Sequence, residues 1–248
     1  MERIKLFCLP YAGGSAAIYY KWRGFLNGHI ALYPVELAGR GKRIRTPLYN
    51  DLKEAVEDIC SIIGPETDGG PYALFGHSMG SLLAFETIYR LEQMGKKSPI
   101  HAFFSGRCAP CIAEKSKILH VLPDGQFKEE ILKMGGTDSE VFENEELSGF
   151  FIPLLKSDFK IVETYRYAEK GEKLKTDITV LSGKADSIAV HEDIAGWRQH
   201  TAGNCEIYEF EGGHFFINSC VKDIADIINH TLTEEYKAVT GAGQVLQE

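Results

Sequence analysis

The chain has 248 residues and a formal net charge of −8 at pH 7, and hydrophobic residues make up 44% of it. This length suits one large domain or two small ones, and the hydrophobic fraction is sufficient for a packed core. The acidic balance without a long basic run argues against nucleic-acid binding, and no run reaches the ~20 apolar residues of a membrane helix.

Six runs of apolar, β-branched and aromatic residues are predicted to be strands. Such continuous apolar runs are typical of parallel strands that are buried on both faces. The predicted strands cover residues 4–9, 30–37, 72–77, 100–106, 177–183 and 206–212. Helical patterns cover residues 51–64, 79–95 and 221–232. This order predicts an α/β fold with a mostly parallel central sheet and helices on both faces.

One long segment interrupts this order, because it contains helical patterns and no clear strand. The first pattern is LPDGQFKEEILKMGG, residues 122–136, and one or two more helices are expected between residues 139 and 169. An insertion at the carboxyl edge of a parallel sheet is well placed to cover a site there. We therefore expect a core of residues 1–111 and 171–236, a helical lid of residues 112–170 and a flexible tail of residues 237–248.

The N-terminal stretch MERIKLFCLPYAGG lacks the layout of a signal peptide, because its apolar run is short and is predicted to be a strand. We therefore expect a cytoplasmic protein whose six cysteines are reduced. Cys108 and Cys111 have the C-x-x-C spacing of some metal and redox sites. Because no second such pair and no nearby pair of histidines accompanies them, ordinary thiols are the favoured interpretation, and no metal ligand is assigned.

The segment YALFGHSMGS, residues 72–81, places Ser78 between two glycines where a predicted strand meets a predicted helix. G-x-S-x-G in this context is the nucleophile-elbow motif, in which glycines leave room for a strained turn that projects the serine. The helix directs its free N–H groups at the same point, so the Met79 N–H is a candidate oxyanion donor. The alternative is an ordinary turn in which Ser78 caps the helix.

A serine hydroxyl needs a general base, and in this order of elements an acid precedes a final histidine. His214 follows the last predicted strand and two glycines, in EFEGGHFF, and is the favoured base; His191 is a weaker alternative. Asp186 follows the fifth strand, where its carboxylate would accept a hydrogen bond from His214. Asp177 precedes that strand and Asp193 falls in the next helix. The alternative role for Asp186 is a turn or a helix cap.

The loop after the first strand, LPYAGGSAAIYY, has small residues at positions 12–14. Small residues allow backbone N–H groups to approach a reacting carbonyl, so the Ala12 N–H is expected to be a second oxyanion donor opposite Met79. The alternative is a phosphate-binding loop. The loop matches neither G-x-G-x-x-G nor a Walker A sequence, which argues against that alternative.

Five motifs in this order resemble one known family. They are FCLPYAGGSA, ELAGRGKR, FGHSMGSLLAFE, LSGKADS and FEGGHFF, and the resemblance runs from about residue 4 to residue 235. The chain resembles the type II thioesterases, which are stand-alone editing enzymes of nonribosomal peptide and polyketide synthetases. The resemblance implies an α/β-hydrolase core with a small helical lid. It also implies hydrolysis of acyl groups from the phosphopantetheine thiol of carrier proteins.

By motif position, the resemblance assigns Ser78, Asp186 and His214 to a catalytic triad and Ala12 and Met79 to the oxyanion hole. It implies no metal and no bound cofactor, since phosphopantetheine arrives as part of the substrate. The expected partners are acyl or peptidyl carrier domains, and the expected state is a monomer. Two positions depart from the common pattern of the family. Ala38 precedes Gly-Arg-Gly where many members have proline, and Ser81 follows the elbow where many have a second glycine.

Two questions stay open at the level of sequence. The basic residues Arg40, Lys42, Arg43 and Arg45 either help to dock an acidic carrier domain or form a solvated loop. The chain could also be another serine α/β-hydrolase, such as a carboxylesterase or an acyl-CoA thioesterase, or a binding module that uses the same scaffold without catalysis.

Overall fold

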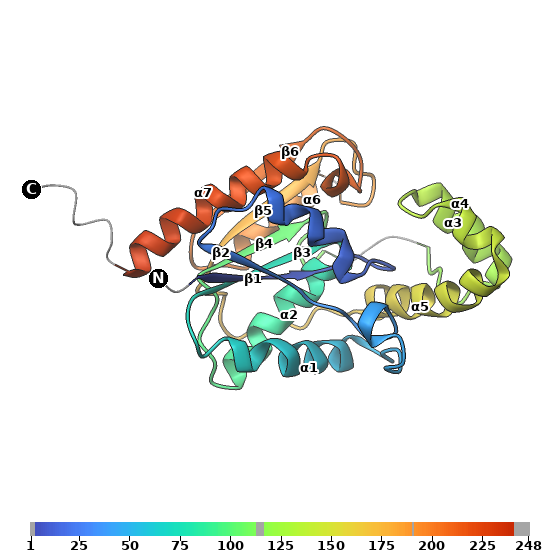
Figure 1. Cartoon of the computed structure of the whole chain (residues 1–248), viewed down its shortest axis with the longest axis horizontal. Helices are drawn as coiled ribbons and strands as arrows, with labels where there is room; N and C mark the ends of the chain where they lie inside the picture. Colours follow the sequence, from blue (N-terminus) through green and yellow to red (C-terminus); the bar gives the residue numbers. More distant parts are fainter. Residues whose placement is uncertain (1–2, 113–116, 190, 241–248) are drawn as a thin grey trace, which may run out of the picture.

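The computed structural model describes residues 3–112, 117–189 and 191–240. Six strands form a single sheet in the order β2-β1-β3-β4-β5-β6 (Figure 1). Every neighbouring pair of strands is parallel. The strands are β1 (Ile4–Leu9), β2 (Ile30–Pro34), β3 (Tyr72–His77), β4 (His101–Ser105), β5 (Asp177–Gly183) and β6 (Cys205–Phe210). The predicted α/β class and the parallel sheet are therefore confirmed.

The register of the sheet brings the carboxyl ends of its strands to one edge. Leu9 at the end of β1 pairs with Gly76, and His77 at the end of β3 pairs with Ser105. Gly183 at the end of β5 pairs with Phe210 in the same way. Because parallel strands all point in one direction, the loops that follow β1, β3, β5 and β6 lie over a common edge.

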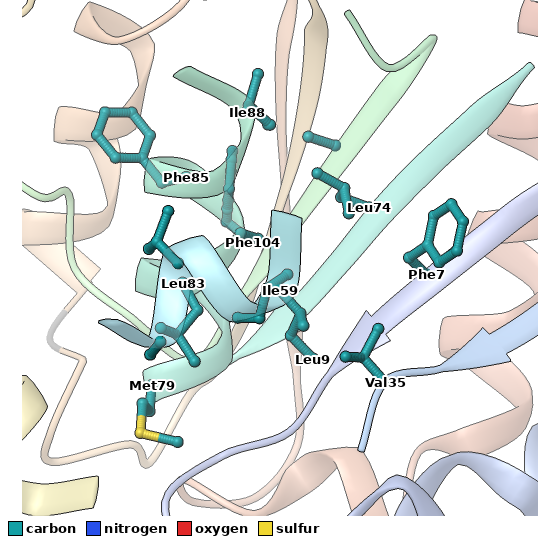
Figure 2. Packing of buried hydrophobic residues seen from close by; sticks show 14 of the residues in the cluster. Phe7, Leu9, Val35, Ile59, Leu74, Met79, Leu83, Phe85, Ile88 and Phe104 are labelled. Carbon is teal, nitrogen blue, oxygen red and sulfur yellow. The ribbon is translucent and has the colours of Figure 1, made fainter. Parts of the chain in front are cut away.

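Helices cover both faces of the sheet. On one face, Phe7, Leu74 and Phe104 of the sheet form a buried cluster with side chains of α1 (Leu52–Ile63) and α2 (Met79–Gln93), as Figure 2 shows. The opposite face packs against the 3₁₀ helix η1 (Ala16–Gly24) and α7 (Val221–Thr240). Successive strand residues point to opposite faces, and continuous apolar runs therefore supply both clusters.

Most predicted boundaries lie close to the observed ones, with two corrections. β2 ends at Pro34, three residues before the predicted end, and Pro34 has no N–H to donate to a further ladder. The predicted tail of residues 237–248 starts too early, because α7 continues to Thr240. Tyr236 packs with the buried cluster beneath that helix, which carries the helix past the predicted end. Residues 241–248 lie outside the described part of the chain.

In the described part of the segment between β4 and β5, three helices project together beyond one end of the sheet (Figure 1). They are α3 (Asp124–Met134), α4 (Ser139–Glu143) and α5 (Glu145–Thr164), and we call them the helical insertion. The insertion has its own small apolar cluster, which includes Phe127, Phe142 and Leu155. Ala12 from the loop after β1 packs against that cluster. The insertion is thereby attached to the edge of the sheet where the candidate residues lie.

The remaining short elements are η2 (Gly41–Arg43), η3 (Gly64–Glu66), α6 (His191–Ile194), η4 (Ala195–Gln199) and η5 (Phe216–Asn218). Within the described ranges, we find no helix with the length and apolar character that crossing a membrane requires.

The aromatic cluster under η1 predicts a large loss of stability on truncation. The centre of the Phe75 ring lies 4.8 Å from that of the Trp22 ring and 5.8 Å from that of the Tyr19 ring. All three side chains are fully buried. We expect Phe75→Ala to lower the free energy of unfolding by about 3–5 kcal/mol, because it leaves a cavity in a close-packed core.

Urea unfolding of the two variants Phe75→Ala and Phe150→Ala measures this difference. Phe150 is 65% exposed, so its truncation should change the free energy of unfolding by no more than about 0.5 kcal/mol. Equal losses in the two variants would contradict the packing described here.

Candidate active site

Ser78 occupies a strained backbone conformation at the junction of β3 and α2. Its φ and ψ are 54° and −114°, and it is the one non-glycine residue with positive φ in the described part of the chain. Such a conformation costs about 1–3 kcal/mol and persists only where the surrounding structure enforces it. The Ser78 N–H donates to the Ser105 carbonyl at 2.7 Å, which ties the turn to β4.

The two flanking glycines are required by close backbone contacts. A Cβ atom on Gly76 would lie 2.1 Å from the Gly80 carbonyl oxygen, and a Cβ atom on Gly80 would lie 2.1 Å from the Leu9 carbonyl oxygen. Real Cβ atoms do not approach backbone atoms this closely, so neither position accepts a larger residue without movement. The helix can therefore begin directly beside the strand, as the elbow motif predicts.

Ser81, which departs from the family pattern, is integrated into this turn. Its Oγ lies 2.8 Å from the carbonyl oxygens of both Gly76 and Ser105, and it accepts the Ser105 N–H at 2.9 Å. The side chain is fully buried. The hydroxyl thus supplies polar partners to backbone groups of β3 and β4 that lie beneath the elbow.

Asp186 and His214 meet as the sequence predicts. His214 Nδ1 lies 2.8 Å from Asp186 Oδ2, and the carboxylate is completely buried. The other oxygen, Oδ1, accepts the N–H groups of Ile188 and Ala189 at 2.8 and 3.1 Å. With three donors on the carboxylate, the ring has a fixed orientation, and Nε2 is the nitrogen left to accept a proton.

Gly183 brings the two loops together, which the sequence did not indicate. A Cβ atom at this position would lie 2.6 Å from the Gly213 carbonyl oxygen and 2.7 Å from the Gly212 carbonyl oxygen. The loops are also joined by a hydrogen bond from the Ala185 N–H to the Gly212 carbonyl at 2.9 Å. The strand-end glycine in LSGKADS was a signal that could have suggested such a close approach.

The two candidate oxyanion donors lie beside Ser78. Met79 is the first residue of α2, where backbone N–H groups have no partner within the helix. Ala12 lies in the turn after β1 and lines the same cavity as Ser78. Within the described ranges, no hydrogen bond joins either N–H to another residue of the chain. Neither N–H is therefore committed to a partner within the described part of the chain.

A cavity joins the candidate residues to the helical insertion. Ser78, His214 and Ala12 line it on the side of the sheet. The helices α3 and α5 contribute apolar side chains on the opposite side, namely Ile131, Met134, Leu155, Phe159 and Val162. Arg107 also lines the cavity and contributes a positively charged side chain to it. The arrangement suits an apolar group with a reactive carbonyl at Ser78.

His77 faces the protein interior rather than the cavity. Its ring is fully buried, with Nδ1 2.8 Å from Ser105 Oγ and its ring centre 5.2 Å from that of His214. Burial, followed by the charge of His214, lowers the pKa of His77 well below its usual value. An uncharged His77 adds no second positive charge next to His214. The buried position of His77 agrees with the choice of His214, rather than His77, as the candidate base.

The other residues weighed from the sequence lie elsewhere. Asp177 begins β5 at the opposite edge, where its carboxylate accepts hydrogen bonds from Asn204. His191 and Asp193 both fall in α6. Cys111 Sγ lies 3.3 Å from the Nε2 atom of His200. Among the residues whose positions are described, no group of three or more His, Cys, Asp or Glu is placed to hold a metal ion.

Only some of the basic side chains in the loop after β2 are exposed at the surface. Lys42 and Arg45 are exposed. Arg43 binds Asp58 through both terminal nitrogens, at 2.6 and 2.7 Å. The idea that Arg40 helps to dock a carrier is wrong, because Arg40 is only 5% exposed and is paired with a buried aspartate of α5.

Comparisons with known proteins agree with this geometry. A family model described as a thioesterase domain matches residues 4–232. The thioesterase PikA5 of Streptomyces venezuelae is 35% identical over 230 residues, which cover 92% of this chain and 81% of that protein.

Two solved structures are also similar to the chain. ClbQ from the colibactin NRPS/PKS pathway is 39% identical, with a TM-score of 0.91 over 96% of this chain and 100% of that one. YbtT, a type II thioesterase from the yersiniabactin NRPS/PKS pathway, is 27% identical with a TM-score of 0.85, and 94% of each chain is covered. The chain therefore belongs to the thioesterase family and is a thioester hydrolase with the α/β-hydrolase fold.

Proposed function

We propose that this thioesterase removes acyl groups from the phosphopantetheine arm of carrier proteins in a nonribosomal peptide or polyketide pathway. The observation that carries the proposal is a strained Ser78 that shares one apolar cavity with His214, whose Nδ1 is bound to a buried carboxylate. The pathways named for ClbQ and YbtT support the class of substrate. The helical insertion would then act as a lid over the acyl group.

The proposed reaction has two steps. In the first, His214 Nε2 takes the proton of the Ser78 hydroxyl while Oγ attacks the thioester carbonyl carbon. The N–H groups of Ala12 and Met79 donate to the negatively charged oxygen that forms. The C–S bond then breaks, and the proton on His214 passes to the departing pantetheine thiolate.

In the second step, water attacks the acyl-enzyme and gives its proton to His214. Collapse of this intermediate releases the free acid and returns the proton to Ser78 Oγ. Asp186 stays ionised and stabilises the imidazolium in both steps. All of these groups come from one chain and water, and phosphopantetheine arrives with the carrier. We accordingly propose that the protein works as a monomer and needs no metal and no bound cofactor. We also propose that it acts in the cytoplasm.

Removal of the Ser78 hydroxyl tests the nucleophile. We expect Ser78→Ala to lower acyl-carrier hydrolysis by at least about 1,000-fold, because no acyl-enzyme can form. Mass spectrometry of the acyl-carrier substrate measures turnover, and a fluorophosphonate probe reports covalent labelling. The matched control is Ser61→Ala, on the exposed side of α1. This variant should keep the wild-type turnover and the wild-type labelling by the probe. Turnover that persists in a folded Ser78→Ala protein would exclude the proposed nucleophile.

A neutral isostere at position 186 tests the acid. In Asp186→Asn, the amide oxygen can still accept hydrogen bonds from the Ile188 and Ala189 N–H groups, while the amide NH₂ faces His214 Nδ1. The ring must then carry its proton on Nε2 and cannot accept the one from Ser78. We expect kcat to fall by about 10³–10⁴-fold. The control is Asp193→Asn, for which we expect a normal kcat. A normal kcat in Asp186→Asn together with a large loss in Asp193→Asn would assign the acid to Asp193.

A substrate panel tests the leaving group. Wild-type protein is assayed with one acyl group presented on a phosphopantetheinylated carrier, on coenzyme A and on p-nitrophenol. We expect the highest kcat/KM with the carrier, since binding of the carrier and its arm adds to transition-state stabilisation. A higher value with the oxygen ester would favour a carboxylesterase, and a higher value with coenzyme A would favour an acyl-CoA thioesterase.

A further inference from the structure

A side chain of the helical insertion holds the loop that carries Ala12. Asp158 lies on the buried face of α5, and its carboxylate is 1% exposed. Its Oδ2 accepts the N–H of Gly13 at 2.8 Å. The two residues are 145 positions apart in the chain, so this contact exists only because α5 packs over the end of β1.

Arg40 completes this buried arrangement. Its Nη1 and Nη2 atoms donate to the two oxygens of Asp158, both at 2.8 Å. The same Nη1 donates to the Gly14 carbonyl at 2.9 Å, and Nε donates to the Ala38 carbonyl at 3.2 Å. The guanidinium thus joins three segments, which are the loop after β1, the loop after β2 and α5.

These contacts orient a tight turn. The Gly14 N–H donates to the Tyr11 carbonyl at 2.8 Å, and Gly13 has a φ of 79°, the value required at the third position of a type II turn. The Tyr11 carbonyl and the Ala12 N–H belong to one planar peptide unit, so the direction of one sets the direction of the other. The Ala12 N–H has no hydrogen-bond partner among the described residues, so it remains for a ligand.

The packing of α5 adds a second restraint on the same turn. Leu155 lies three residues before Asp158, on the same face of the helix. A Cβ atom on Gly13 would lie 2.7 Å from Leu155 Cδ1, so the helix is in direct contact with the turn. The orientation of the Ala12 N–H therefore depends on where α5 lies.

A buried ion pair is a poor source of stability, because removing two charges from water costs about as much as their attraction returns. Compared with two apolar side chains at the same positions, the Arg40–Asp158 pair adds directional hydrogen bonds to backbone groups. We propose that Asp158, held by Arg40, is a positioning residue that orients the Ala12 N–H in the oxyanion hole. The inference rests on the proposed function, since it assigns that N–H to the reacting oxygen.

The test is Asp158→Asn. An amide oxygen in the place of Oδ2 can still accept from Gly13 and from Arg40 Nη1, but the NH₂ group then faces Arg40 Nη2, which is also a donor. The two-bond pair with Arg40 cannot form, so the carboxamide and the Gly13 contact must shift. We expect kcat on an acyl-carrier to fall about 10- to 100-fold with KM close to that of the wild type, as for a weakened oxyanion donor. An alkyl trifluoromethyl ketone forms an oxyanion on Ser78 that needs the same donors. Its inhibition constant should rise by the factor by which kcat/KM falls.

Asp58→Asn is the matched control. Asp58 makes a similar two-bond pair with Arg43 and also binds Tyr49, and none of these residues belongs to the turn of residues 11–14. We expect a lowered unfolding temperature in this variant with normal kcat and a normal inhibition constant. If Asp158→Asn loses stability but keeps both kinetic values, Asp158 has only a structural role and the inference is wrong.

Arg40→Lys provides the second variant if Asp158→Asn does not fold. Lysine keeps the charge but loses the fork that reaches both Asp158 and Gly14, so the same linked change in kcat and inhibition constant is expected. Normal values of both in Arg40→Lys would overturn the inference. A wild-type protein without acyl-carrier hydrolysis would instead reject the proposed function, and with it this inference.

Discussion

The structure depends on a close approach between the end of β3 and the start of α2. Gly76 and Gly80 lie so near to neighbouring backbone that a side chain on either would collide with a carbonyl oxygen. The chain must reverse direction between them, and Ser78 takes a positive φ as a result. Apolar packing of Leu83 and Ile88 in α2 against the sheet offsets this local strain (Figure 2).

The same geometry explains how distant residues meet. Parallel strands deliver the loops after β1, β3, β5 and β6 to one edge, and local contacts then set each side chain. Asp186 is surrounded by three hydrogen-bond donors in a buried position, and Gly183 lets the loop of His214 pass directly over it. The Asp186–His214 pair is therefore held in one arrangement, next to a cavity with apolar walls.

The helical insertion supplies more than apolar walls. Through Asp158 and Arg40 it makes polar contact with the backbone turn that contains Ala12. Two arginines that are close in sequence thus have different surroundings. Arg40 is buried against α5, whereas Arg43 pairs with Asp58 at a partly exposed position of α1. A basic loop in a sequence can therefore be part of an interior network.

Sequence patterns predicted the strands, the elbow turn and the helical character of the insertion, and they singled out Ser78, Asp186 and His214 as candidates for the site. The strands, helices and elbow follow from short local patterns, such as apolar runs and flanking glycines. The candidates Asp186 and His214 follow from the order of strand ends along the chain. Three features become visible only in the folded chain. Arg40 is buried, Gly183 allows the close approach of the Asp186 and His214 loops, and α7 extends to Thr240. These features depend on residues that are distant in the chain, as with the 118 positions between Arg40 and Asp158. Whether a charge is solvated or buried is set by what packs over it, and no local pattern contains that information.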